Sequence, residues 1–236
     1  MAGITDAKFC LKLIPFGFDM VTLGGYNIDP DTINAGEKIL QRGRPEFSIK
    51  EEDYFDVVYN QAKEIKENWN GLVSVNLRST TPDPIIEISR IKEVDVVEIN
   101  AHCRQSEITE IGCGQAMLQD LEILEEFSAE VVKKSSTKVS LKFRANVTNL
   151  DNLAIAKAVE SAGCDFIHID AMKPGFNYAD WDIIQEISQN IETFLIGNNS
   201  IVDIDSAKKM LSAGANGISI ARAAMGGRIN FDLSKI

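Results

Sequence analysis

Short apolar runs alternate with longer segments of helical periodicity from residue 20 to the end of the chain. The runs are apolar on both faces, which is typical of parallel strands covered on both sides of a sheet. Seven strands are expected, at residues 20–23, 72–77, 94–99, 139–143, 166–169, 193–196 and 217–220. Helices are expected between them, at residues 50–69, 84–91, 115–134, 152–162, 181–189 and 206–213. This alternation predicts a parallel α/β fold.

The length of 236 residues fits one (β/α)8 TIM barrel, so residues 1–236 are expected to form a single domain. A closed barrel has eight strands, and the pattern supplies seven. We therefore expect the first strand to be truncated, with the protein beginning upstream of Met1, or to be irregular, within residues 11–16. A barrel without that strand has two open edges. Residues 12–16, or a partner chain in a homo-oligomer, are expected to cover them.

The last two expected strands end in small and polar residues. One run closes in Gly197-Asn198-Asn199 and the next in Ala221-Arg222-Ala223. The loops after the last two strands of such barrels hold phosphate groups on backbone N–H groups, so this segment predicts a phosphorylated ligand. The alternative is a pair of ordinary turns, which also favour Gly and Asn.

The composition narrows the function classes. The net charge is −11, from 24 basic and 35 acidic residues, so the chain lacks the general basic character that supports binding to nucleic acid. No apolar run approaches the roughly 20 residues of a membrane span, and no signal peptide opens the chain. Four cysteines without a CxxC pair, and only two histidines, argue against a metal site. A cytoplasmic protein with free thiols is expected.

Polar residues occur in pairs at the ends of four expected strands, where a doubly covered sheet should be apolar. The pairs are Asn76 and Arg78, Glu98 and Asn100, Lys142 and Arg144, and His168 and Asp170. Each pair has i, i+2 spacing, so both members share one face. Catalytic residues of this fold lie at the carboxyl ends of its strands, and the pairs predict a site there. The alternative is a structural layer in which Glu98 neutralises Lys142 or Arg144.

Cys103 lies in the loop after one of these strands, three residues beyond Asn100. His102 and Arg104 flank it, and nearby cations favour a thiolate. A thiol near a hydride-accepting ring can instead act as a general acid. The third alternative is a small buried hydrophobe, which is also the expectation for Cys113.

Five motifs occur in a fixed order, four of them at expected strand ends: Met1-Ala2-Gly3-Ile4-Thr5-Asp6, Asn100-Ala101-His102-Cys103-Arg104, Lys142-Phe143-Arg144, Gly197-Asn198-Asn199-Ser200 and Ala221-Arg222-Ala223. They resemble the P-M-A-G-[VI]-T-D, N-x-G-C-P, K-x-R, G-N-G-D and G-R-G motifs of the flavin-dependent dihydrouridine synthases. More distantly, the chain resembles the dihydroorotate dehydrogenases. The resemblance covers nearly the whole chain.

The resemblance implies FMN as the cofactor. Ala2 and Gly3 would lie against its ring, Asn76 and Asn100 near its polar edge, and Lys142 near N1 and O2, where a cation stabilises reduced flavin. The phosphate would be held by the residues of the last two motifs, Gly197, Asn198, Asn199, Ala221 and Arg222. Cys103 would donate a proton to the substrate while the flavin supplies hydride, with Lys142 as the second catalytic residue.

The chain departs from the family pattern at several positions. Asp170 stands where the family has a cofactor-contacting histidine, and His168 lies two residues earlier on the same face. Asn199 replaces a glycine, although Asn tolerates positive φ better than most residues. His102 and Arg104 replace the Gly and Pro beside the catalytic cysteine. We also expect no C-terminal helical domain of the kind that binds tRNA in this family.

These observations favour an FMN-dependent oxidoreductase that reduces or oxidises a C=C bond of a pyrimidine-like substrate. The acidic charge favours a small molecule, bound by Arg78, Arg104, Arg144 and His168, whereas the order of the motifs favours tRNA. One alternative is a non-catalytic or flavin-free barrel that binds a phosphorylated ligand. Another is a sugar-phosphate isomerase or an aldolase-type barrel that uses Lys142.

Overall fold

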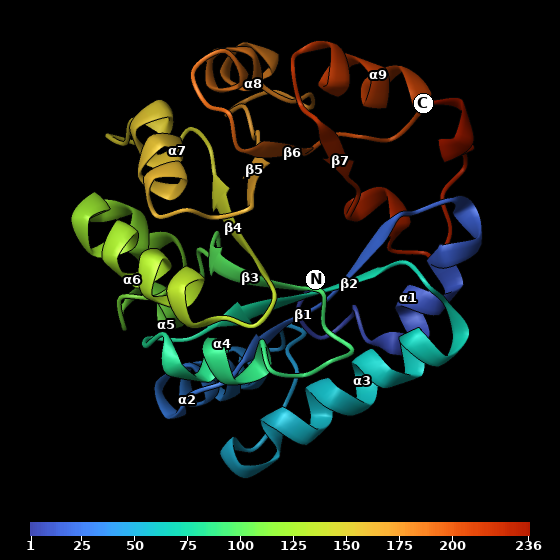
Figure 1. Ribbon diagram of the computed structural model, residues 1–236. Helices are drawn as coiled ribbons and strands as arrows, with labels where there is room; N and C mark the ends of the chain where they lie inside the picture. The colour runs from blue at the N-terminus through green and yellow to red at the C-terminus, as the bar shows by residue number, and fades with distance from the viewer.

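Seven parallel strands form one curled sheet in the computed structural model, which describes residues 1–236 (Figure 1). Neighbours in the sheet are neighbours in the chain, as expected of repeated strand–helix units. The strands are β1 (Met20–Asn27), β2 (Leu72–Arg78), β3 (Val96–Ala101), β4 (Lys138–Arg144), β5 (Phe166–Asp170), β6 (Phe194–Asn198) and β7 (Gly217–Ser219). The expected α/β barrel class is confirmed, with seven strands and no ladder between β7 and β1.

The helices lie on the outside of the sheet (Figure 1). They are α1 (Ala7–Leu13), α2 (Pro30–Gln41), α3 (Tyr54–Asn68), α4 (Asp83–Ile88), α5 (Ser106–Thr109), α6 (Leu121–Lys134), α7 (Asn152–Ser161), α8 (Trp181–Ser188) and α9 (Ile204–Ser212). Three of them, α1, α2 and α5, were not expected. The sequence does carry a signal for α2, because Asp29 caps it, Pro30 opens it and Thr32 completes a capping box.

β1 continues four residues beyond its expected end at residue 23. The predicted strand ends at residue 23 because Gly24 and Gly25 interrupt the apolar run. In the structure the two glycines form an irregularity, with a register shift against β2 between Gly24 and Tyr26. Gly25 has no room for a side chain, since a Cβ atom there would lie 2.6 Å from the Asn76 Oδ1 atom. The glycines therefore bring the backbone of β1 close to the polar interior.

The position of the eighth strand is filled by helical structure. The expectation of an irregular strand within residues 11–16 is wrong, because this segment forms the end of α1 and a 3-10 turn, Ile14–Phe16. Leu13 packs against Ala224 and Ile229 near the other end of the chain. Residues 12–16 thus bridge the two ends through side-chain packing, as one of the stated expectations had it. The N-terminus itself lies near the centre of the barrel (Figure 1).

None of the helices combines the length and apolar character that crossing a membrane requires. All four cysteines are free thiols. Cys10, Cys113 and Cys164 are buried, whereas Cys103 is partly exposed.

Candidate active site at the barrel mouth

The strand register brings the expected polar pairs together at the carboxyl ends of β2 to β5. Asn76 is opposite Glu98, Lys142 is opposite both Asn100 and His168, and Arg144 is opposite Asp170. The i, i+2 spacing of polar residues in the sequence therefore predicted a cluster of polar side chains that the structure contains. It forms two layers, one within the barrel and one at its mouth.

Glu98 is the centre of the inner layer, with only 2% of its surface exposed. The Asn76 amide donates to Glu98 Oε1 at 2.8 Å, and the Ser140 hydroxyl donates to Oε2 at 3.1 Å. The His168 Nδ1 atom lies 2.7 Å from the same Oε2. The structural alternative was thus correct in kind, because Glu98 does belong to a buried network, although its nearest partner there is His168 rather than Lys142 or Arg144.

Lys142 projects from this network toward the mouth. Its Nζ atom lies 3.1 Å from His168 Nε2. Burial lowers the pKa of His168, and the charge of Lys142 lowers it further. Burial would raise the pKa of Glu98, but His168 and Lys142 hold it below its usual range. A neutral His168 then donates through Nδ1 to Glu98 and accepts at Nε2 from the Lys142 ammonium, which fixes the direction of that cation.

Asp170 organises the outer layer. Its Oδ2 atom lies 3.0 Å from Arg144 Nη1 and 2.6 Å from His102 Nε2, and its Oδ1 accepts from the Asn199 amide. Burial lowers the pKa of His102 to about 4, so the ring is neutral at pH 7. Burial would raise the pKa of Asp170, but His102 and Arg144 hold it low. Asp170 therefore joins the Cys103 loop, β4 and the phosphate loop through one carboxylate.

Asn100 holds the Cys103 loop in place. Its Oδ1 atom accepts from the backbone N–H groups of His102, at 3.1 Å, and Cys103, at 2.9 Å. Its amide donates to Asn76 Oδ1 at 2.7 Å, so the loop is tied to the inner layer. The expected edge contacts of Asn76 and Asn100 with a cofactor thus compete with hydrogen bonds inside the protein. Cys113 is buried as expected, and burial raises its pKa to about 12.

Two residues expected to bind substrate are not accessible at the rim. Arg78 is 1% exposed and forms an ion pair with Glu46, with Nη2 and Oε2 2.5 Å apart. His168 is 4% exposed and belongs to the inner layer. The expectation failed for Arg78 because Glu46 comes from the segment between α2 and α3, and no local pattern shows where such a segment packs. Of the other two, Arg104 is exposed and Arg144 is partly buried.

The two expected phosphate loops lie side by side at the ends of β6 and β7. The Asn198 amide donates to the Ser219 carbonyl at 2.6 Å and ties them together. Asn199 and Ser200 have φ values of +102° and +53°, so Asn199 does adopt the conformation that the missing glycine would favour. The backbone N–H groups of Asn199, Ser200 and Ala221 have no acceptor within the protein. These free donors form a cradle suited to a phosphate.

Other expected cofactor residues have additional or different roles. The Arg222 guanidinium is exposed and reaches Asn199 Oδ1 at 3.4 Å, beside the cradle. Gly197 is required for packing, because a Cβ atom there would lie 2.3 Å from the Met210 sulfur of α9. Ala2 is partly buried at the mouth, and one face of Gly3 is covered, since a Cβ atom on it would lie 2.6 Å from the Glu46 nitrogen.

Comparison with known proteins identifies the family of this chain. A profile of the dihydrouridine synthase family matches residues 50–231. An uncharacterized protein of Methanocaldococcus jannaschii is 37% identical over 234 residues, which is 98% of this chain and 89% of that protein. The tRNA-dihydrouridine synthase B of Vibrio parahaemolyticus is 23% identical over 235 residues, 96% of this chain. This chain spans about two thirds of that synthase, namely 66% of its length.

A solved structure supports the fold. FabK from Thermotoga maritima superposes with a TM-score of 0.58 at 14% identity, over 92% of this chain and 54% of that one. The chain belongs to the dihydrouridine synthase family. Members of this family are FMN-dependent oxidoreductases, so the flavin implied by the sequence motifs is confirmed as the family's cofactor.

The residues at the mouth fit FMN on structural grounds. Three free backbone donors and the exposed Arg222 suit a phosphate group. The Nε atom of Arg144 is buried and has no hydrogen-bond partner within the protein. Lys142 supplies a cation whose direction is fixed by His168.

Proposed function

We propose that this chain is an FMN-dependent oxidoreductase that interconverts a uracil ring and its 5,6-dihydro form within RNA. The observation that carries this proposal is the convergence of Lys142, Cys103 and the free phosphate cradle on one barrel mouth. Each of these features occurs at a strand end, and each matches one motif of the family. A non-catalytic barrel would have no need for the thiol and the directed cation.

The proposed roles follow from the contacts of each residue. Bound FMN would supply hydride. Lys142 would stabilise negative charge near the ring, because His168 and Glu98 hold its ammonium toward the mouth. Asn199, Ser200, Ala221 and Arg222 would hold the phosphate. Cys103, on a loop fixed by Asn100, would donate the proton.

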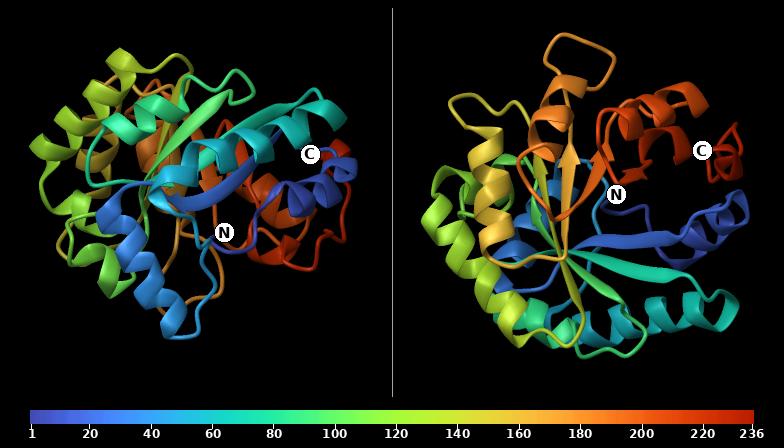
Figure 2. Two further views of the ribbon diagram at one scale, coloured as in Figure 1. Left: turned by 90° about the horizontal axis from the view of Figure 1, so that it is seen from below. Right: turned by 45° about the horizontal axis from the view of Figure 1, so that its top comes forward.

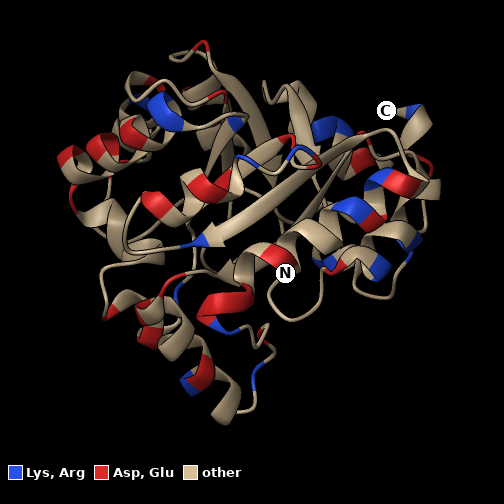
Figure 3. Cartoon of the chain, turned by 60° about the horizontal axis from the view of Figure 1, so that its bottom comes forward, with Lys and Arg blue, Asp and Glu red and all other residues tan.

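Several features of the mouth support an RNA substrate. The related bacterial proteins are tRNA-dihydrouridine synthases by name, so the comparisons do not support the small-molecule preference drawn from composition. That preference rested in part on net charge, but many acidic residues lie on the outer helices (Figure 3). Arg104 and Arg222 are exposed on the site loops, and Arg144 is directed by Asp170.

The loop after β5 adds aromatic surface near the same mouth, and it projects from the barrel (Figure 2, right). Phe176 and Tyr178 on this loop are 56% and 42% exposed, and their ring centroids lie 5.0 Å apart. Lys173 lies over both rings, at 5.6 and 5.9 Å from the centroids. Exposed aromatic rings beside cations are typical of surfaces that stack unpaired RNA bases. These residues are therefore proposed to contact the RNA chain beside the reacting uracil.

The experiment has a cofactor arm and a substrate arm. Purified protein, reconstituted with FMN and freed of excess by gel filtration, should retain flavin absorbance. The dithionite-reduced protein should then form dihydrouridine in an unmodified tRNA transcript, measured by nucleoside mass spectrometry, but not 5,6-dihydrouracil from free uracil. Cys103→Ala is the matched control. Retained flavin with reduction of free uracil alone would overturn the RNA assignment, and absence of flavin binding would overturn the oxidoreductase.

A further inference from the structure

Arg78 is a buried cation directly beside the Cys103 thiol, and none of the motifs above accounts for it. Its Nη1 atom lies 3.7 Å from Cys103 Sγ, within hydrogen-bond distance for sulfur. The same guanidinium contacts Glu46 through both Nη atoms, at 3.2 and 2.5 Å, and donates to the Gly25 carbonyl at 2.9 Å. Arg78 is 1% exposed, so its guanidinium is not hydrated by solvent.

The surroundings of Arg78 fix its charge and its direction. Burial alone would lower the pKa of Arg78, but Glu46 and Cys103 hold it above its usual value. The planar guanidinium is restrained by three different partners: a carboxylate, a carbonyl and the thiol. The cation therefore stays charged and stays against the sulfur.

We propose that Arg78 is a positioning residue for Cys103, which directs the sulfur and stabilises the negative charge that forms on it. This inference rests on the proposed function for the reaction in which it acts. In that step the S–H bond of Cys103 breaks and a C–H bond forms on the substrate ring, while the electron pair stays on sulfur. The hydride for the neighbouring ring carbon comes from reduced FMN, and solvent returns the proton to the thiolate.

The physical reason is the change in the Arg78 contact during that step. A hydrogen bond from a guanidinium to a neutral thiol is weak, but the same bond to a thiolate joins opposite charges. The interaction is therefore stronger after proton transfer than before it, which is the condition for accelerating a step. Glu46 opposes this effect, because its carboxylate neutralises part of the same cation. Arg78 and Glu46 are thus expected to act on the sulfur in opposite directions.

Alkylation of the native protein by iodoacetamide measures this effect without flavin or RNA. The thiolate is the reacting species, and Cys103 is the partly exposed cysteine while the other three are buried, so peptide mass spectrometry can follow its labelling. At pH 7, Arg78→Met should slow alkylation of Cys103 by about fivefold or more, because the thiolate loses its neighbouring cation. Glu46→Gln should accelerate alkylation, and Arg78→Lys should restore part of the rate. Arg90→Met, an exposed arginine far from the mouth, is the matched control.

The opposite signs distinguish this role from a structural one. Arg78→Met and Glu46→Gln break the same buried ion pair, so damage to packing alone would change the alkylation rate in the same direction in both variants. Such a result would overturn the proposal. If Arg78→Met does not fold by circular dichroism, the rise with Glu46→Gln and the rate of Arg78→Lys decide the question, and an unchanged or lower rate with Glu46→Gln overturns it. Failure of the RNA assay leaves the alkylation result unaffected.

Discussion

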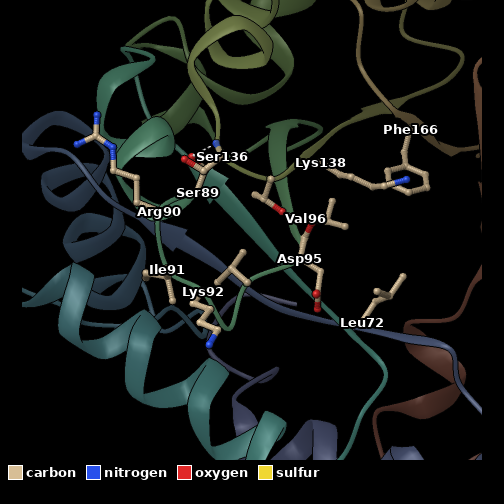
Figure 4. Close-up of a pocket in the computed structure, with 12 residues that line it drawn as sticks. Leu72, Ser89, Arg90, Ile91, Lys92, Asp95, Val96, Ser136, Lys138 and Phe166 are labelled. Atoms are coloured by element: carbon tan, nitrogen blue, oxygen red, sulfur yellow. Dashed lines mark hydrogen bonds between the residues drawn. The ribbon is translucent and has the colours of Figure 1, made fainter.

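The two ends of the barrel differ in chemistry more than in shape. At the amino ends of the strands lies a hollow of about 410 Å³, lined by residues that include Leu72, Asp95, Lys138 and Phe166 (Figure 4). Several of its polar groups have partners within the protein. Asp95 pairs with Lys66 at 2.6 Å and accepts from the Val73 N–H at 2.7 Å, and Lys138 lies over the Phe166 ring at 5.3 Å.

The carboxyl ends of the strands present the opposite case. There the free backbone donors of Asn199, Ser200 and Ala221, the unpartnered Arg144 Nε and the directed Lys142 all meet at one mouth. The difference teaches that a hollow by itself does not mark the functional end of this fold. The functional end is marked instead by polar groups that are fixed in place and lack partners within the protein. The free-energy cost of leaving such groups unpaired is offset only when a ligand binds.

The largest expected effect is on stability, at the centre of the inner layer. Glu98→Ala should lower the free energy of unfolding by about 3–5 kcal/mol, because it leaves buried polar partners unpaired. Those partners are Asn76, Ser140 and His168. Lys66→Ala breaks the partly exposed pair at the other end of the barrel and should cost at most about 1 kcal/mol. Urea unfolding measures both, and equal losses would contradict the contrast between the two ends.

The next effect is on catalysis. Cys103→Ala should slow dihydrouridine formation by about 100-fold or more, as for loss of a general acid, while FMN remains bound. Single-turnover kinetics with reduced protein measures the rate, and flavin absorbance after gel filtration measures retention. Cys164→Ala, at a buried cysteine outside the mouth, is the control. Loss of flavin from the Cys103 variant would show instead that this residue is structural.

A smaller effect is expected at the phosphate cradle. Arg222→Ala should weaken FMN binding by about 1.5–3 kcal/mol, since it removes a charge-assisted contact to the phosphate. Lys138→Ala, in the hollow at the other end, should leave FMN affinity unchanged. Fluorescence titration of the apoprotein with FMN compares the two variants. An unchanged affinity with Arg222→Ala would remove the phosphate from this position.

A separate effect is expected on the pH dependence of stability. His102 has an ordinary pKa of 6.5, which burial lowers to about 4 in the folded protein. Between these values the unfolded chain binds a proton that the folded chain does not, so the free energy of unfolding should fall as the pH falls from 6.5 to 4. His102→Gln should make this fall in stability shallower. Urea unfolding of both proteins at several pH values measures the free energy of unfolding, and parallel curves against pH would contradict the role of His102.

The sequence by itself determined the seven strands, most of the helices and the end of the barrel where the polar cluster lies. Apolar runs gave the seven strands, because a strand covered on both faces must be apolar throughout. Polar residues at i, i+2 spacing then predicted the cluster, because alternation places both members on one face. The loops after β6 and β7, which we propose to hold a phosphate, were also visible, since Asn199 keeps the left-handed backbone in place of glycine.

Only the tertiary structure decided which polar residues are accessible and which are part of the interior. Arg78 looked like a rim residue but is covered by Glu46, and Gly197, which is predicted to contact the cofactor, also leaves space for Met210. The gap left by the eighth strand is bridged by α1 and the C-terminal segment. Each of these contacts joins residues more than ten positions apart. Local patterns carry the period of an element and its ends, but burial and pairing depend on which distant segment packs against it.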